Sequence, residues 1–436
     1  MNKSKIVYLK KFLFVSIGAY IGDLAWQVSK EGHDVKYFIK DKDQQNLADG
    51  FVSKVTDWRS HTDWADVIVF DDTCGFGTNA QALRKKGKLV IGGTTYTDSL
   101  EDNREFGQLE LKKHGISILP FQEFSSCESA IEYIKKYPAE YVIKPSGRLS
   151  NISMKRMLYV GQMEDGSDVI RILNSYNKRR KNKLVDLQLQ QKISGVEYAI
   201  GGFFNGNKFI TPFHHAFEHK KLFPGEVGIT TGEMGTSMFW KESNLLSQAT
   251  IERFTGKLRE EKFVGYFDIN CIITQKNIYP LEFTCRFGYP TIMIQQDTFK
   301  TPTGEFLYKL AKGEDSNLKV KEGFHVGVRV VVPPYPYQDK TAFETLSKDN
   351  LIFFKDQDKT GVHIEDVKSE EGQWIVSGTQ GTVLVVVGSG STIKLAQKQA
   401  YSRIKNIIIP HMYYRNDIGN RWESDYPLLK SWGYLD

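Results

Sequence analysis

The amino-terminal part of the chain alternates short apolar runs with segments of helical periodicity, and few folds accept that order. The expected strands fall at residues 12–16, 35–39, 67–70 and 89–91, and the expected helices at 23–30 and 80–87. This alternation predicts a doubly wound parallel sheet, in which ligands bind beyond the carboxyl ends of the strands. Gly18, Gly22, Asp71 and Asp72 follow such strand ends. The Gly18-x-x-x-Gly22 spacing is not a dinucleotide fingerprint, and it suits a tight strand-to-helix turn as well as a phosphate cradle.

Length and composition limit the possible classes of protein. A chain of 436 residues suggests two to four domains. The net charge of +6 is mild over this length, so it allows an anionic small substrate and does not demand nucleic acid. No apolar run is long enough to span a membrane. The four cysteines lack metal-binding spacing, and we expect reduced thiols in a cytoplasmic protein.

A second unit begins near Thr94. We expect helices at residues 99–114 and 126–136, a strand edge at 116–120 and a strand at 141–144. That last strand ends in Lys144, and a buried lysine is costly unless it meets an anion. Lys144 is therefore either a ligand of a nucleotide phosphate or an ordinary edge-strand lysine. The basic run at 178–183 is typical of a solvated loop, a further strand is expected at 187–193, and Asn205-Gly206 predicts a hairpin turn.

The most informative stretch lies between residues 264 and 290. Asp268 and Asn270 alternate along one expected strand and so share one face of it. An antiparallel partner at 278–283 carries Glu282 and then Thr284 on one face, with Arg286 two residues further on. Two carboxylates on paired strands beside an arginine suit Mg²⁺ that bridges the oxygens of a triphosphate. The alternative is a buried ion pair of Arg286 with one of the carboxylates.

Five motifs together resemble the ATP-grasp ligases, and most closely the phosphoribosylamine–glycine ligase family. The chain reads LEFTCRFGYP at residues 281–290, where the family has EFNARFGDP, and GEMG at 232–235, where the family has TGGMG. It reads EHKK at 218–221, similar to DHKR, and YVIK at 141–144, similar to the VVKADG strand. The stretch MYYRNDIG at 412–419 resembles the carboxyl-terminal YRRDIG. The matches follow the family's order and spacing along nearly the whole chain.

The resemblance implies a reaction and a set of site residues. The family makes an acyl phosphate from a carboxylate and ATP, and an amine then attacks it to form an amide. The resemblance implies catalytic roles for Arg286 and Lys144, and a site for Mg²⁺ (or Mn²⁺) at Asp268, Glu282 and Thr284. The implied ATP-binding residues are Arg104, Lys144, Lys155, Gln190, Gln191, Ile193 and Glu197. The implied substrate-binding residues are Gly22, Asp72, His219, Lys220, Thr231, Glu233 and Met234.

The chain departs from the family pattern at the metal, the flap and the substrate end. Thr284 stands where the family has a metal-binding asparagine, and Asn270 is a candidate to compensate. The glycine-rich flap is replaced by RLSNISMK at 148–155, so side chains rather than backbone N–H groups would close over the phosphates. Two acidic residues, Asp71 and Asp72, occupy the place of the GPE motif, and Glu233 replaces a glycine. These carboxylates would repel a 5′-phosphate and suggest a larger or cationic amine.

We therefore expect an α/β protein of three parts. These are a Rossmann-like domain at 1–96, an ATP-grasp α+β domain at 97–322 with a flexible ATP lid at about 125–195, and a β-rich cap at 323–436. Arg415 and Asp417 either hold this cap against the ATP-grasp core or form a plain surface ion pair. The expected activity is ATP-dependent ligation of a small carboxylate, such as glycine or another amino acid, to an amine. The alternatives are a ligase that joins an amino acid to a modified nucleotide, and a nucleotide-binding module without chemistry. The oligomeric state stays open.

Overall fold

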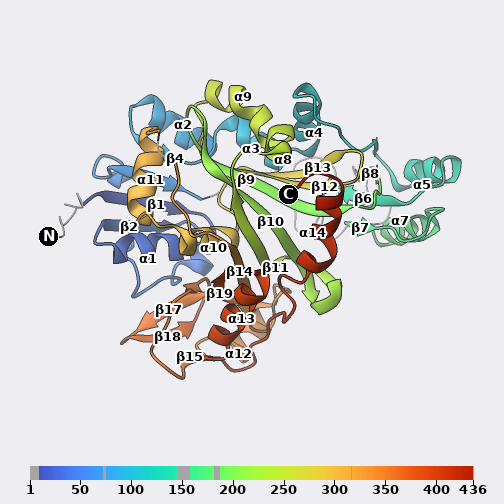
Figure 1. Ribbon diagram of the computed structural model, residues 1–436. Helices are drawn as coiled ribbons and strands as arrows, with labels where there is room; N and C mark the ends of the chain where they lie inside the picture. Colours follow the sequence, from blue (N-terminus) through green and yellow to red (C-terminus); the bar gives the residue numbers. More distant parts are fainter. Residues whose placement is uncertain (1–8, 72–74, 146–157, 181–186, 316, 436) are drawn as a thin grey trace.

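The computed structural model describes residues 9–71, 75–145, 158–180, 187–315 and 317–435 (Figure 1). The amino-terminal sheet has the strand order β2-β1-β3-β4, and all of its pairs are parallel, which confirms the doubly wound prediction. Its residues 12–15 are fully buried, as expected of a strand with covered faces. The elements of this part are β1 (Lys11–Ser16), α1 (Gly22–Lys30), β2 (Asp34–Ile39), β3 (Val67–Phe70), α2 (Gly77–Lys85) and β4 (Leu89–Ile91).

A large antiparallel sheet runs through the centre of the molecule, with the strand order β13-β12-β9-β10-β11-β14-β19-β16. Alternation along its strands separates two faces: Phe267 and Ile269 enter one apolar cluster, whereas Asp268 and Asn270 face the opposite side. The strands are β9 (Val196–Asn205), β10 (Phe209–Phe223), β11 (Val227–Lys241), β12 (Val264–Ile273), β13 (Ile278–Thr284), β14 (Phe324–Val331), β16 (Val362–Ile364) and β19 (Thr382–Gly390). The hairpin expected at Asn205-Gly206 joins β9 to β10.

A small sheet of order β5-β8-β6-β7 forms a separate lobe with α5 and α7, at the right of Figure 1. Its inner face has its own apolar core, which contains Ile143, Leu187 and Leu189. The elements are β5 (Phe121–Phe124), α5 (Cys127–Lys136), β6 (Tyr141–Pro145), β7 (Tyr159–Val160), α7 (Ser167–Arg180) and β8 (Leu187–Gln191). Ser126 caps α5 by accepting a hydrogen bond from the backbone N–H of Ser129.

Three expectations for this region were wrong in detail. The helix expected at 99–114 is two helices, α3 (Thr95–Asp102) and α4 (Arg104–Lys113), because extended Asn103 ends the first and caps the second. The strand expected at 116–120 is irregular chain, and β5 begins only at Phe121. The basic run at 178–183 begins inside α7 rather than in a loop, and residues 181–183 lie outside the described residues.

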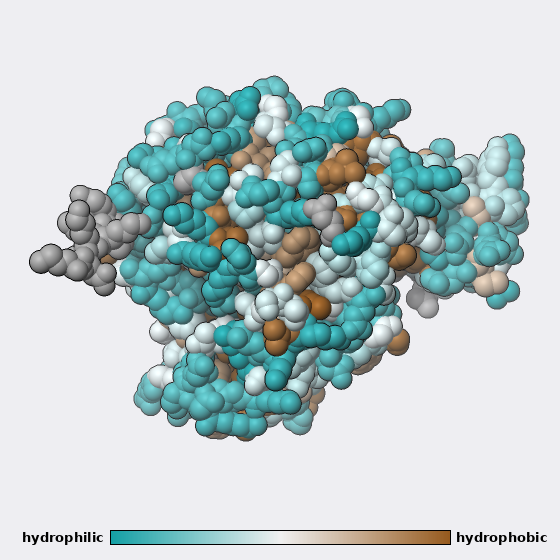
Figure 2. All heavy atoms as spheres, viewed as in Figure 1, coloured by the Kyte–Doolittle hydropathy of each residue, from teal (hydrophilic) through white to brown (hydrophobic). Residues whose placement is uncertain are grey.

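The carboxyl-terminal part combines strands of the large sheet with a further sheet of order β17-β18-β15-β20. Its elements are α12 (Lys340–Leu346), β15 (Leu351–Phe354), β17 (Val367–Glu370), β18 (Gln373–Val376), α13 (Ile393–Ile404), β20 (Ile407–Ile408) and α14 (Arg421–Ser431); the central helices are α8 (Leu245–Ala249), α9 (Thr255–Glu260), α10 (Thr291–Thr298) and α11 (Thr303–Lys312). Among the described residues no helix has the length and apolar character that a membrane span requires. Hydrophilic residues cover most of the face in Figure 2, and hydrophobic residues form small separate groups there.

Candidate active site

The carboxylates predicted to bind a metal lie on paired strands. In the register of β12 and β13, Asp268 is opposite Thr284 and Asn270 is opposite Glu282. Their side chains line a polar cavity of about 120 Å³, to which Arg286 also contributes. Residues directly opposite on one face of an antiparallel pair have Cβ atoms about 5 Å apart. The alternation read from the sequence therefore brings these oxygen ligands together at one cavity.

Lys220 occupies the centre of this group of carboxylates. Its Nζ lies 2.9 Å from Glu197, 3.1 Å from Glu282 and 3.4 Å from Glu218. Burial opposes the charge of the ammonium, but the carboxylates of Glu282, Glu218 and Glu197 raise the pKa of Lys220 well above its usual value. In return, Lys220 lowers the pKa of Glu282 to about 2. We call the carboxylates of Glu197, Glu218 and Glu282 the carboxylate cage. This cage stabilises a positive charge, which is the property that a cation site requires.

Arg286 is held by an ion pair that sequence reasoning did not find. Its Nη2 lies 3.1 Å from the Glu101 carboxylate, and its Nη1 donates to the backbone oxygen of Phe287 at 3.0 Å. Burial raises the pKa of Glu101, and the guanidinium of Arg286 opposes that rise. Glu101 also accepts a hydrogen bond from the backbone N–H of Cys285 at 2.8 Å. Helix α3 therefore fixes both the side chain of Arg286 and the backbone beside it.

The polar face of the small sheet carries the predicted nucleotide residues. In the register of β6 and β8, Lys144 is opposite Gln188 and Val142 is opposite Gln190, so Lys144 shares a face with both glutamines. Lys144 is 8% exposed. Burial and the neighbouring Arg104 lower the pKa of Lys144 to about 7. A phosphate bound beside Lys144 would raise this pKa again, because a nearby negative charge favours the protonated amine.

Three buried polar atoms on this side have no hydrogen-bond partner among the described residues. They are Nη1 of Arg104, Oε1 of Gln188 and Nε2 of Gln190. Buried polar groups are normally paired, so orphaned donors and acceptors of this kind fit a missing polar ligand. Arg104 and Lys144 suit phosphate oxygens, whereas the amides of the glutamines suit a base that both donates and accepts. The residues present therefore fit ATP.

The remaining predicted nucleotide residues are more peripheral. Gln191 is exposed at the end of β8, and Ile193 is half-buried just beyond it. Glu197 on β9 bridges to Lys220 and so belongs to the carboxylate cage as much as to a nucleotide pocket. Lys155, with the rest of the flap at 148–155, lies outside the described residues.

Of the predicted substrate residues, Lys220 and Glu233 line the cavity. Glu233 is 5% exposed, and burial together with the neighbouring Glu218 raises its pKa well above the usual value. Thr231 uses its hydroxyl to donate to the backbone oxygen of Lys220 at 2.8 Å. Asp72 lies outside the described residues.

Besides Thr231, three predicted substrate contacts do not line this cavity, and strand alternation or packing explains each of the three. His219 lies between Glu218 and Lys220 on β10, so its side chain points to the opposite face of the sheet. Met234 alternates with Glu233 in the same way and is fully buried against Leu222 and Val331. Gly22 lies at the start of α1, where a Cβ would meet the methyl group of Ala48 at 3.3 Å, so it permits close packing.

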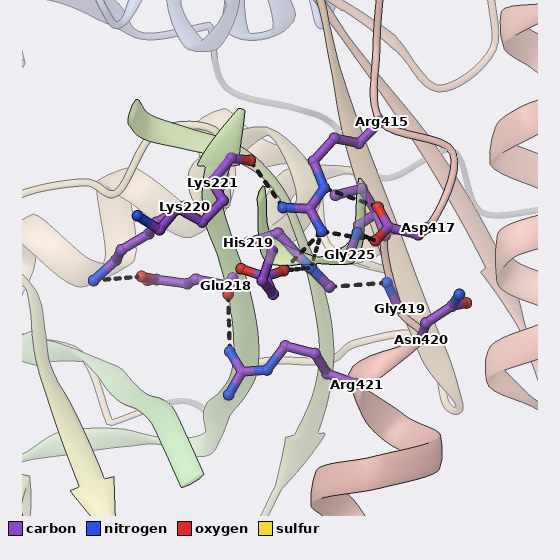
Figure 3. A network of polar contacts seen from close by, with 12 residues as sticks. Glu218, His219, Lys220, Lys221, Gly225, Arg415, Asp417, Gly419, Asn420 and Arg421 are labelled. Atoms are coloured by element: carbon purple, nitrogen blue, oxygen red, sulfur yellow. Dashed lines mark hydrogen bonds and ion pairs between the residues drawn. The ribbon is translucent and has the colours of Figure 1, made fainter. Parts of the chain in front are cut away.

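His219 instead belongs to a buried network with the carboxyl-terminal segment (Figure 3). Arg415, which is 0% exposed, bonds to Glu226 at 2.7 Å and to both oxygens of Asp417 at 2.8 Å. It also donates to the backbone oxygen of Lys221 at 2.8 Å. Nδ1 of His219 lies 2.9 Å from Glu226, and its Nε2 accepts from the backbone N–H of Gly419 at 3.1 Å. Arg415 and Asp417 therefore form a buried contact between the carboxyl-terminal segment and β10, and not a surface ion pair. We call this contact the latch.

The carboxyl-terminal segment also holds the backbone of the strands that carry the site. Arg421, at the start of α14, donates to the backbone oxygens of Glu218 at 2.9 Å and Glu197 at 2.6 Å. The residues whose backbones are held in this way carry the side chains that surround Lys220. His219, Glu226 and Asp417 also have metal-ligating geometry, but the guanidinium of Arg415 already lies against both carboxylates of this group. That cluster is therefore structural.

Sequence reasoning missed Glu218, Gln188 and Glu101 as members of the site. Glu218 stands two residues before Lys220 on one strand, and Gln188 stands two before Gln190, so alternation alone marks both. No local pattern marks Glu101, because its contact with Arg286 joins α3 to the chain after β13.

Comparison with known proteins agrees with this geometry. The family described as "Phosphoribosylglycinamide synthetase, ATP-grasp (A) domain" matches residues 102–292, and its "C domain" matches residues 325–421. Phosphoribosylamine–glycine ligase of Lactococcus lactis is 26% identical over 341 residues, which cover 76% of this chain and 78% of that protein. The Clostridium acetobutylicum ligase of the same name is 27% identical over 348 residues, which cover 77% and 80%.

Solved structures share the fold. A phosphoribosylamine–glycine ligase from Thermotoga maritima superimposes with a TM-score of 0.70 at 20% identity, over 94% of this chain and 100% of that one. A biotin carboxylase from Campylobacter jejuni, solved as a β-γ-ATP complex, gives a TM-score of 0.61 at 12% identity over 97% of each chain.

The fold and the carboxylate cavity define an ATP-grasp protein, a class that uses ATP and divalent metal ions. With both matched domains in order along it, the chain belongs to the phosphoribosylglycinamide synthetase family and is an ATP-dependent carboxylate–amine ligase of that type.

Proposed function

We propose that this ligase joins an amino acid, with glycine as the first candidate, to an amine through an acyl phosphate. The observation that carries the proposal is the meeting of Asp268, Glu282 and Thr284 at one cavity, within electrostatic reach of Lys144 and Arg104. Relatives named phosphoribosylamine–glycine ligase support glycine as the acid and phosphoribosylamine as an amine to test. We also propose a cytoplasmic location, because the three described cysteines are free buried thiols.

The reaction has two displacements. A carboxylate oxygen of the amino acid attacks the γ-phosphorus of ATP, and ADP leaves with the bonding electrons. The neutral amine nitrogen then attacks the acyl carbon, the phosphate leaves with the C–O electron pair, and the nitrogen gives up one proton to that phosphate. Activation is needed because a carboxylate is a poor electrophile, so the protein contributes chiefly positioning and charge stabilisation.

Each residue has a stated part in this scheme. Lys144 and Arg104 would hold the phosphates of ATP, and Arg286, anchored by Glu101, would neutralise the transferred phosphoryl group. Mg²⁺ or Mn²⁺ would neutralise phosphate oxygens, and Asp268, Glu282 and Thr284 would hold it, with Asn270 as an additional oxygen ligand. Gln188, Gln190, Gln191 and Ile193 would line the base, and the small sheet would close over it as a lid.

The test is release of ADP and phosphate from MgATP with glycine and phosphoribosylamine, followed by mass spectrometry of the product. We expect release that depends on both an acid and an amine. Glu282→Gln removes a metal ligand and almost no volume, so it should lower turnover at least 100-fold and leave the fold intact. Glu242→Gln, which removes an exposed carboxylate just after β11, is the matched control. Turnover that Glu282→Gln leaves unchanged contradicts the metal assignment.

A further inference from the structure

Two buried polar side chains lie against the proposed metal ligand Asp268. The hydroxyl oxygen of Tyr266 lies 3.0 Å from Oδ2 of Asp268 and 2.9 Å from Nδ1 of His214. Tyr266 and His214 are each 1% exposed, and Asp268 is 4% exposed. Neither Tyr266 nor His214 binds ATP or the metal ion in the proposed reaction. The reason for this contact therefore lies in its effect on Asp268.

The chemistry of the three groups fixes the direction of each hydrogen bond. An ionised carboxylate only accepts, so the Tyr266 hydroxyl donates its single proton to Oδ2 of Asp268. The oxygen of Tyr266 then accepts, and Nδ1 of His214 is the donor. A hydrogen bond to an ionised acceptor is roughly twice as strong as one between neutral groups. His214 therefore keeps the hydroxyl oriented for the stronger bond, which it makes to Asp268.

A glycine on the strand between these residues leaves the space for their contact. Asp268 on β12 and His214 on β10 are both opposite Gly201 of β9. A Cβ at Gly201 would lie 2.1 Å from the hydroxyl oxygen of Tyr266 and 2.5 Å from Oδ2 of Asp268. The backbone of Gly201 does not adopt the left-handed conformation that favours glycine. Gly201 is therefore required for the room that it leaves, and the Tyr266 hydroxyl occupies that room.

The contact distinguishes the two oxygens of Asp268. Within the described part of the chain, Tyr266 and His214 both approach Oδ2, and Nδ1 of His214 lies 3.7 Å from it. A carboxylate that is bonded through one oxygen presents the other in a restricted range of directions. Hydrogen bonds that orient a metal ligand in this way typically contribute about 10- to 100-fold to metal affinity.

We propose that Tyr266 is a positioning residue, whose hydroxyl holds Oδ2 of Asp268 so that Oδ1 stays available to a divalent cation; the inference rests on the proposed metal site of the ligase. His214 orients the hydroxyl, and Gly201 makes room for it. Tyr266 itself does not bind the cation. Loss of the hydroxyl should therefore weaken cation binding and leave the nucleotide residues of the small sheet unaffected.

The test titrates Mn²⁺ into the full chain in the presence of ADP and follows binding by electron paramagnetic resonance. Tyr266→Phe removes only the hydroxyl, so we expect the Kd for Mn²⁺ to rise at least tenfold. The Kd for ADP without metal, measured by calorimetry, should stay within twofold. An unchanged Kd for Mn²⁺ in Tyr266→Phe overturns the proposal, even if the variant is less stable, because a merely structural hydroxyl would affect only stability.

The matched control removes a second buried hydroxyl from the same sheet. Tyr198 on β9 is 0% exposed and belongs to the apolar cluster on the opposite face. Its hydroxyl has no hydrogen-bond partner among the described residues. Tyr198→Phe should therefore leave the Kd for Mn²⁺ within twofold. A rise in Tyr198→Phe as large as that in Tyr266→Phe would make the effect a general one of the sheet and overturn the proposal.

A second pair of variants tests the same contact with its three side chains intact. Gly201→Ala places a methyl group where the Tyr266 hydroxyl lies, so the Kd for Mn²⁺ should again rise at least tenfold. Gly202→Ala crowds Phe213 instead, at 2.8 Å, and should leave that Kd within twofold. If Tyr266→Phe fails to fold, this pair decides the proposal, and equal Mn²⁺ affinity in the two alanine variants overturns it.

Asp268→Asn separates this proposal from the metal site on which it rests. A rise of at least tenfold in the Kd for Mn²⁺ in Asp268→Asn, with no change in Tyr266→Phe, keeps the metal site and refutes the positioning role. An unchanged Kd in Asp268→Asn removes Asp268 from the metal ligands and refutes both. Because binding is measured without turnover, these outcomes hold whichever acid and amine the ligase joins.

Discussion

Among single residues, Lys144 combines burial with a charge that the fold itself does not satisfy. Burial and Arg104 lower its pKa to about 7, so at neutral pH the neutral amine is populated beside the charged form. A phosphate raises that pKa again, because an opposite charge favours the protonated form. ATP binding should therefore be accompanied by proton uptake. Calorimetry in buffers of different ionisation enthalpy measures that uptake directly.

Substitution of Lys144 tests the same idea. Lys144→Met keeps the aliphatic stem and removes the charge, so we expect the Kd for ATP to rise on the order of tenfold and the proton uptake to disappear. The free energy of unfolding should not fall, because a desolvated charge has been removed. Lys135→Met, at an exposed position on α5, is the control and should change neither quantity. Unaltered ATP affinity in Lys144→Met would refute the phosphate role.

Among single residues, the sequence predicted those neighbours that follow from the alternation of side chains along a strand. It placed Asp268, Asn270, Glu282 and Thr284 together because period-two patterning fixes which side chains share a face. The same rule, applied to β10, separates Lys220 from His219, and the motif resemblance alone had grouped those two. The contact of Glu101 with Arg286 was not predictable, since it depends on how α3 packs against the large sheet.

Among elements, the carboxyl-terminal latch is the most demanding contact. Arg415→Met leaves the carboxylates of Glu226 and Asp417 facing each other without their shared cation, so the free energy of unfolding should fall by about 2–4 kcal/mol. Turnover should fall further than stability explains, because the backbone of Lys221 loses its support and the carboxylate cage shifts. Chemical denaturation and steady-state kinetics measure the two effects.

The control for the latch is a second ion pair in the same part of the chain. Lys394→Met breaks an exposed contact with Glu423 and should cost no more than about 1 kcal/mol. If Arg415→Met is no more harmful than Lys394→Met, the buried network does not position the site.

The boundaries of two elements show what local sequence patterns do not predict. The apolar spacing of residues 99–114 looked continuous, but the side chain of Asn103 accepts from the backbone N–H of Phe106 and starts a new helix. Residues 116–120 were apolar enough for a strand, yet the register of β5 with β8 begins at Phe121. In both cases a hydrogen bond that periodicity does not encode decided the outcome.

Across the whole molecule, one buried histidine joins three distant elements. His363 on β16 lies 2.8 Å from Asp23 on α1 and 3.8 Å from Asp297 on α10. Burial disfavours its charge, but Asp23 and Asp297 raise the pKa of His363 to about 9. A raised pKa means that the protonated form stabilises the fold. That contribution is complete below about pH 6.5 and is lost as the pH rises through about 9.

The expected consequence is a fall of about 3 kcal/mol in the free energy of unfolding over that range. Urea denaturation at pH 6.5 and pH 9.5 should show this fall in the wild type and a much smaller one in His363→Gln. His411→Asn, which changes an exposed histidine, should behave as the wild type does. Equal pH dependence in wild type and His363→Gln would contradict the charged state of His363.

The general architecture was predictable at this scale, and the continuity of the large sheet was not. Alternating strands and helices predicted the parallel amino-terminal sheet, and the motif order predicted the ATP-grasp centre. The carboxyl-terminal part was expected as a separate cap, yet β14 pairs with β11 through Gly235 and Val328. Pairing of strands this far apart in the chain leaves no local trace in the sequence. The boundaries at residues 96 and 322 stay predictions.

The latch also sets the order in which a newly made molecule gains activity. Arg415 and Arg421, near the end of the chain, hold the backbones of Glu197, Glu218 and Lys221, which were synthesised some two hundred residues earlier. While a ribosome still encloses residues 415–421, the carboxylate cage lacks this support. A nascent or truncated chain that lacks residues 415–421 is therefore expected to be unable to hydrolyse ATP, and catalysis begins only after these residues have folded onto β9 and β10.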